Sequence, residues 1–74
     1  MATIRLNLNL IDIVKKKEIK INVEQPTALK DILKNTGINE EDIGLVIKNG
    51  KWAPIECKVS RDDLIELFPY QSGG

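Results

Sequence analysis

The last residues of this 74-residue chain carry its clearest chemical signal. Gly73 and Gly74 have no side chains and great backbone freedom, so we expect residues 71–74 to form a flexible tail behind a single domain over residues 1–70. Fully extended, such a tail reaches roughly 13–14 Å, at about 3.3–3.6 Å per residue. It can carry a terminal carboxylate into a narrow active site of another protein. The chemistry that this permits is acyl transfer on the α-carboxyl group of Gly74.

A carboxylate is a poor acyl donor, so Gly74 must first be activated, most simply as an acyl-adenylate. The chain has no Gly-x-x-x-x-Gly-Lys-Ser/Thr loop that would hold the phosphates of ATP. We therefore expect no bound cofactor, and we expect ATP to be used in trans by an adenylating partner. The alternative is that the two glycines are an inert chain end.

The rest of the chain offers little for catalysis of its own, so we do not expect an enzyme. Histidine, the usual general base at neutral pH and the commonest metal ligand, is absent from the sequence. The single cysteine, Cys57, excludes an intramolecular disulfide and a cysteine-rich zinc site, and it fits a reducing compartment. We interpret Cys57 as a small residue in a loop or at an edge, with its pKa slightly lowered by Lys58, rather than as a sulfur acceptor.

The charges argue against nucleic acid and membranes as partners. Eleven basic and eleven acidic residues cancel, so no overall field attracts the chain to a polyanion. Residues 1–37 carry seven basic and four acidic groups, whereas residues 38–74 carry four and seven, which favours a protein partner with a basic surface. We expect the acidic runs 40–42 and 62–63 to steer that partner rather than to form a catalytic pair. With no apolar run of about 18 residues and no signal peptide, the sequence predicts a soluble, cytoplasmic protein.

The elements that position the tail follow from the hydrophobic pattern. Residues 3–10 alternate between polar and apolar and predict a strand, whose phase slips at Ile11 and Ile13 because of a bulge or the strand's end. Residues 19–23 alternate again, so residues 3–23 read as a hairpin with a solvated tip at lysines 15–17.

A helix of about ten residues is expected over residues 28–37. Leu29, Ile32 and Leu33 form one apolar stripe, and Thr27 is the expected N-cap. Gly37 is placed to be the left-handed residue after the helix, with Ile38 making the hydrophobic contact of a Schellman ending.

The second half of the chain reads as three strands. Residues 45–48 and 51–53 flank a tight Asn49-Gly50 turn, residues 55–63 connect, and residues 64–68 form the last strand before Pro69. The order strand, strand, helix, strand, strand, strand predicts an α+β, β-grasp (ubiquitin-like) roll. In this roll a mixed sheet of about five strands has the first and last strands at its centre and one main helix on one face.

One face of that sheet should remain partly open. Ile65 and Leu67 are expected beneath the helix, which places Leu64 and Phe68 on the open face, where apolar groups often mark an interface. We therefore predict partner contacts at Leu64, Phe68, Pro69 and Tyr70. We expect Trp52 to pack in the core or at an edge rather than to bind.

Two segments carry a resemblance to a known family. Residues 60–74, with an acidic turn, an alternating strand, Phe68-Pro69 and the final Gly-Gly, resemble the small subunit of molybdopterin synthase, in the MoaD/ThiS group of sulfur carriers. Residues 46–51 look like the Asn-Gly hairpin of that family. The chain departs from the molybdopterin branch where Tyr70, rather than a second proline, follows Pro69.

The resemblance implies a sulfur carrier and its partners. A ubiquitin-activating-type enzyme would adenylate Gly74, and sulfur transfer would convert it to a thiocarboxylate. The tail, Gln71, Ser72 and Gly73 included, would enter the active site of a larger synthase subunit, or of another sulfur-acceptor enzyme, and serve molybdopterin (molybdenum or tungsten cofactor) synthesis. Alternatives are sulfur delivery for the thiazole of thiamine or another pathway, a ubiquitin-like protein modifier, and a binding module with an inert tail.

Overall fold

The computed structural model describes residues 1–8 and 10–69 of the chain, apart from the side chain of Ile13. The predictions made for Asn9, for Tyr70 and for the tail, Gln71, Ser72, Gly73 and Gly74, therefore lie outside the described residues.

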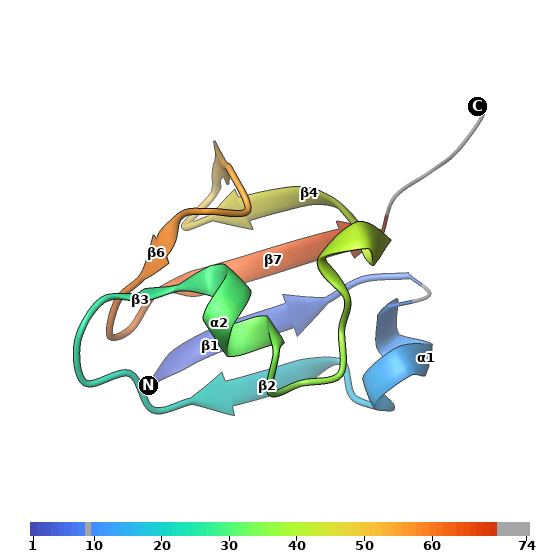
Figure 1. Ribbon diagram of the computed structural model, residues 1–74, viewed down its shortest axis with the longest axis horizontal. Helices are drawn as coiled ribbons and strands as arrows, with labels where there is room; N and C mark the ends of the chain where they lie inside the picture. The colour runs from blue at the N-terminus through green and yellow to red at the C-terminus, as the bar shows by residue number, and fades with distance from the viewer. Residues whose placement is uncertain (9, 70–74) are drawn as a thin grey trace.

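Five strands form one mixed sheet in the order β2-β1-β7-β4-β5 (Figure 1). They are β1 (Ala2–Leu6), β2 (Glu18–Ile21), β4 (Ile43–Lys48), β5 (Lys51–Ala53) and β7 (Leu64–Pro69). A second, two-stranded sheet joins β3 (Thr27–Ala28) to β6 (Lys58–Val59). The helices are α1 (Leu10–Val14), α2 (Leu29–Leu33) and the 3₁₀ turn η1 (Glu40–Asp42).

The first and last strands pair in parallel at the centre of the sheet, as the element order predicts. β1 also pairs antiparallel with β2, and β7 pairs antiparallel with β4. This strand order, the mixed sheet and the helix on one face confirm the α+β β-grasp prediction.

The core lies between this sheet and α2, which Figure 1 shows in front of the strands. Leu29 and Leu33 of α2 are buried, and so are Ile65 and Leu67 of β7. The alternating pattern of β7 thus places its apolar residues beneath the helix as predicted, because neighbouring side chains of a strand point to opposite faces.

The first predicted strand is too long. β1 ends at Leu6, and residues 10–14 form helix α1 where we expected the strand to continue to residue 10 and then to slip in phase. Leu10 is almost fully buried, and Ile11 and Val14 pack against the core. The apparent phase slip is therefore a change from strand to helical periodicity, so α1 replaces the simple lysine-tipped hairpin turn between the antiparallel strands β1 and β2.

The predicted helix is shorter and begins differently. Thr27 belongs to β3, its hydroxyl donates to the carbonyl of Gln25 at 2.9 Å, and no side chain caps α2. The amide of Leu29 instead donates to the carbonyl of Cys57 at 2.9 Å, so strand pairing between β3 and β6 supplies the partner that a cap would provide. The expected connection over residues 55–63 is wrong in this respect, since it contains β6.

The end of α2 is also tighter than expected. The helix stops at Leu33 and continues as turns, with the amide of Thr36 donating to Leu33 at 3.0 Å. Gly37 has the predicted left-handed conformation, with φ of 86°. The amide of Ile38 donates to the hydroxyl of Thr36 at 3.3 Å rather than to a helix carbonyl as in a Schellman motif, while its side chain is buried as expected.

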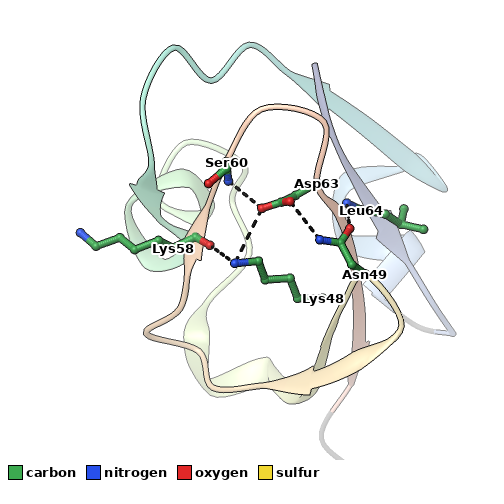
Figure 2. Close-up of polar contacts among 6 residues, drawn as sticks. All are labelled: Lys48, Asn49, Lys58, Ser60, Asp63 and Leu64. Atoms are coloured by element: carbon green, nitrogen blue, oxygen red, sulfur yellow. Dashed lines mark hydrogen bonds and ion pairs between the residues drawn. The ribbon is translucent and has the colours of Figure 1, made fainter.

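A polar cluster ties the Asn49-Gly50 turn to the start of β7 (Figure 2). The turn has the predicted positive φ angles of 50° and 84°. The Asn49 side-chain oxygen accepts from the amide of Leu64 at 2.8 Å, and its Nδ2 donates to Asp63 at 2.9 Å. Asp63 also accepts from the amide of Ser60 at 2.7 Å and lies 3.8 Å from the ammonium of Lys48.

These contacts set the charge state of Asp63. Partial burial acts to raise the pKa of this carboxyl, but the hydrogen bonds from Asn49 and Ser60, together with Lys48, outweigh it and lower the pKa below the ordinary value of 3.8. Because the folded state favours the ionised form, Asp63 stabilises the fold above its ordinary pKa. That contribution is lost as the pH falls through the lowered folded-state value.

We predict that Asp63→Asn lowers the free energy of unfolding at neutral pH by about 1–3 kcal/mol, because the amide of Ser60 and the ammonium of Lys48 lose a carboxylate partner. Urea denaturation across a pH series measures this, and the difference from the wild type should shrink below about pH 4. Asp62→Asn is the matched control. Asp62 is exposed and pairs only with the N-terminal ammonium, at 3.2 Å, among the described residues, so its loss should cost little. A difference that is the same at every pH would contradict this role of the Asp63 charge.

Candidate functional site

The face of the sheet opposite α2 is the candidate docking surface. Its members follow from the registers, because residues that are paired across strands point to the same face. Leu45 lies opposite Phe68, Ile47 lies opposite both Glu66 and Trp52, Arg5 lies opposite Glu66 and Glu18, and Thr3 lies opposite Leu64 and Lys20.

The half of this face built by β7, β4 and β5 is apolar. We call Leu45, Ile47, Trp52 and Phe68 the apolar patch. Trp52 is 70% exposed and Leu45 is 37% exposed, while Ile47 and Phe68 are half-buried. Neighbouring apolar side chains left uncovered on a small domain mark a surface that gains free energy when a partner covers it.

The other half of the face is charged and is satisfied internally. The guanidinium of Arg5 lies 3.6 Å from Glu18 and 4.0 Å from Glu66, and the ammonium of Lys20 lies 3.5 Å from Glu18. Lys20 also donates to the hydroxyl of Thr3 at 3.1 Å. These exposed groups contribute little to stability. They form ion pairs with one another, whereas the side chains of the apolar patch form no ion pair or hydrogen bond within residues 1–8 and 10–69.

The end of β7 is held in place beside the apolar patch. Both the backbone amide and the side-chain Nδ2 of Asn7 donate to the carbonyl of Leu67, at 3.1 and 3.0 Å. On the other side Pro69 lies opposite Ile43, next to a bulge between Ile43 and Leu45. Whatever follows Pro69 therefore starts from a fixed point that adjoins Phe68.

The structure describes three of the four residues that we predicted to contact a partner, Leu64, Phe68 and Pro69. Phe68 and Leu64 lie half-buried on the open face, as the alternation predicts, and Pro69 is the half-buried last residue of β7. Leu64 is separated from the apolar patch by Glu66. That these residues touch a partner remains a prediction, and Tyr70 is outside the described residues.

Trp52 is the residue that our sequence analysis missed. It belongs to the edge strand β5, but it is largely exposed and does not pack in the core. The signal was present in the phase of the hairpin. Val46 and Ala53 are paired and buried, so Ile47 and Trp52, one position away on each strand, must face outward.

Cys57 lies in the loop between β5 and β6, as expected, and is half-buried. Burial raises the pKa of its thiol, and the charge of Lys48 offsets this only in part, so the expected lowering by Lys58 is wrong. A raised pKa disfavours the nucleophilic thiolate. Across residues 1–8 and 10–69, no cluster of three or more His, Cys, Asp or Glu residues could hold a metal ion.

The acidic runs lie on turns. Residues 40–42 form η1, Asp62 pairs with the N-terminus and Asp63 belongs to the polar cluster of Figure 2.

None of the described helices is long and apolar enough to cross a membrane.

A family model described as Mut7-C ubiquitin matches residues 2–73. Among solved structures, SAMP1 from Haloferax volcanii is 20% identical with a TM-score of 0.73, and the alignment covers 99% of this chain and 98% of that one. A putative molybdopterin converting factor, subunit 1, from Pyrococcus furiosus is 13% identical with a TM-score of 0.73, covering 92% and 94%. The Haloferax volcanii HVO 2177 protein is 20% identical with a TM-score of 0.75, covering 99% and 85%. No curated protein sequence matches the chain.

These structural neighbours show only that the fold is shared, because their sequence identities are low. The family match, by contrast, spans almost the whole chain, and it agrees with the ubiquitin-like resemblance carried by residues 46–51 and 60–74. This chain belongs to the Mut7-C ubiquitin family and has the ubiquitin-like β-grasp fold.

Proposed function

We propose that this protein is a ubiquitin-like carrier whose reactive group is the α-carboxyl of Gly74. The observation that carries the proposal is the position of the apolar patch, which adjoins the fixed end of β7 from which the chain runs on to Gly73 and Gly74. A ubiquitin-activating-type enzyme would dock on this patch and receive the residues that follow Pro69 in its active site. The globular domain is then the handle and Gly74 is the reagent.

The chemistry at Gly74 proceeds in two steps. The carboxylate attacks the α-phosphate of ATP, which forms the acyl-adenylate and releases pyrophosphate. A sulfide nucleophile then attacks the acyl carbon, the new carbon–sulfur bond replaces the bond to AMP, and AMP leaves with the electron pair. The resulting thiocarboxylate donates its sulfur inside a larger synthase subunit or another acceptor enzyme. Our leading pathway is molybdopterin synthesis, with thiazole formation or another sulfur-requiring pathway as the alternative.

A protein modifier is the second candidate. It is supported by the similarity of this chain over almost its full length to Haloferax volcanii SAMP1 and small archaeal modifier protein 1. Here the amine of a substrate lysine attacks the acyl-adenylate in place of sulfide, forms an amide with Gly74 and displaces AMP. Both candidates share the activation step and the docking surface. They differ only in the nucleophile.

Intact-mass analysis of the protein recovered from its own cells separates these functions. A carrier should show the exchange of one oxygen for sulfur at Gly74, and a modifier should show Gly74 joined to lysines of other proteins. Deletion of Gly74 should abolish either product with little change in the unfolding midpoint. A chain that always ends in an unmodified carboxylate, or that always continues past Gly74, would contradict the proposal.

We further predict that Trp52→Ser lowers kcat/KM for adenylation by the activating enzyme by about tenfold, because large aromatic side chains dominate protein interfaces. The measurement is ATP–pyrophosphate exchange with the carrier as the varied substrate. Lys51→Ser is the matched control, since Lys51 is exposed on the same strand but points to the opposite face. The unfolding midpoint of both variants should stay near that of the wild type. An equal decrease in kcat/KM for the two variants would contradict the assignment of the docking face.

A further inference from the structure

A second surface lies on the other side of the molecule from the apolar patch. An open groove of about 520 Å³ runs between β2 and the end of α2. Ile19, Ile21 and Val23 line one wall, and Ile32 and Asn35 line the other. The groove is therefore on the helix-covered side of the sheet, along its outermost strand in Figure 1.

The groove exists because α2 is too short to cover the edge of the sheet. Ile19 and Ile21 lie opposite the buried residues Ile4 and Ala2, so their side chains point to the helix side. They are nevertheless only half-buried, since α2 has five residues and packs over the middle of the sheet. The result is an apolar floor next to a strand edge.

The backbone of β2 has unpaired groups along this groove. The amide of Leu6 donates to the carbonyl of Lys17 at 2.8 Å, and hydrogen-bonded pairs alternate along an antiparallel ladder. The groups of Ile19 and Ile21 therefore point toward β1, whereas the N–H and C=O groups of Glu18 and Lys20 point to the outer edge. Within the described part of the chain no other strand pairs with that edge.

Basic residues lie next to one end of the groove, and Glu24 lies at the other end. Lysines 15–17 directly precede β2, and none of the three forms an ion pair within the described residues. The opposite end continues into a polar recess lined by Glu24, Gln25 and Asn22. Lys20 and Asp31 also line the groove. The ammonium of Lys20 lies 3.5 Å from Glu18 and the carboxylate of Asp31 lies 3.6 Å from the ammonium of Lys34, so each already has an ion-pair partner.

We propose that this groove binds an extended segment of another protein, which adds a strand to β2. Its apolar side chains would occupy the groove at every second position, and its acidic residues would lie beside lysines 15–17. Strand addition takes affinity from the free backbone groups and specificity from the pockets for alternate side chains, and this edge offers both. The four residues of β2 span only about 13 Å. A strand edge of this length can pair with a short peptide, whereas a stable dimer buries roughly 800 Å² of surface on each partner.

This binding is independent of Gly74 and of the apolar patch, because the two surfaces lie on opposite faces of the sheet. A protein bound at β2 can accompany the carrier while the other face docks on an activating enzyme. The two proposals therefore fail separately: loss of peptide binding should leave adenylation unchanged.

The test uses the 15N-labelled chain and a short synthetic peptide in which two glutamates precede alternating valine and threonine, together with its reverse sequence. Titration followed by NMR should shift the amides of Glu18, Lys20 and Asn22 and should slow hydrogen exchange at Lys20. The amide and indole signals of Trp52 should stay in place. A peptide with lysines in place of the glutamates should bind more weakly.

Two variants of one residue make the test specific to the strand edge. Lys20→Pro removes the outward N–H without touching the ladder to β1, since proline is tolerated on an edge strand where its nitrogen faces outward. It should weaken peptide binding by about tenfold, and Lys20→Ala by less than about twofold. If Lys20→Pro perturbs the fold, a peptide with N-methylated amides on the side facing β2 tests the same bonds against the wild type, with the same loss expected.

Several results would overturn this inference. One is the absence of saturable binding by either peptide, and another is an equal loss with Lys20→Pro and Lys20→Ala. Shifts centred on Trp52 would place the peptide on the other face. Self-association that Lys20→Pro abolishes would make a second copy of the chain the occupant of the edge.

Discussion

The parallel pairing of β1 with β7 is the contact on which the rest of this structure depends. It places the last strand between β1 and β4, so that both backbone edges of β7 are bonded and its inward residues, Ile65 and Leu67, are completely buried. A strand held on both sides has no freedom to slip, because a shift by one residue would turn these side chains to solvent. The registers of β1 and β4, and with them the composition of both faces, follow from that single placement.

Both ends of β7 are secured by polar groups rather than by packing. At the start, Asn49 and Asp63 join the Asn-Gly turn to the turn before β7, with Lys48 completing the charge balance. At the end, Asn7 directs two donors at the carbonyl of Leu67. Polar contacts of this kind are directional. They fix the positions of both ends of β7, which a hydrophobic core alone does not specify.

The two faces of the sheet have different physical roles. One carries α2 and the core, and the shortness of α2 leaves the groove along β2 at its margin. The other face divides into ion pairs around Arg5 and Glu18 and the apolar patch around Phe68 and Trp52. A domain of this size has few residues to spare for function, because most apolar side chains are needed in a small core. The uncovered apolar groups are thus the strongest physical indication of where partners bind.

The amino-acid sequence by itself determined the local features whose physics is short-range. The alternation in residues 64–68, the positive φ of Asn49 and Gly50, the left-handed Gly37 and the central position of the first and last strands all follow from periodicity, turn chemistry and element order. The tertiary structure alone decided features that depend on distant partners. Residues 10–14 become helical because Leu10 reaches the core, and Thr27 joins a strand because Val59 pairs with it. The phase of the hairpin places Trp52 on the face opposite Ala53, but only the tertiary structure decides that α2 covers the face of Ala53 and leaves that of Trp52 exposed.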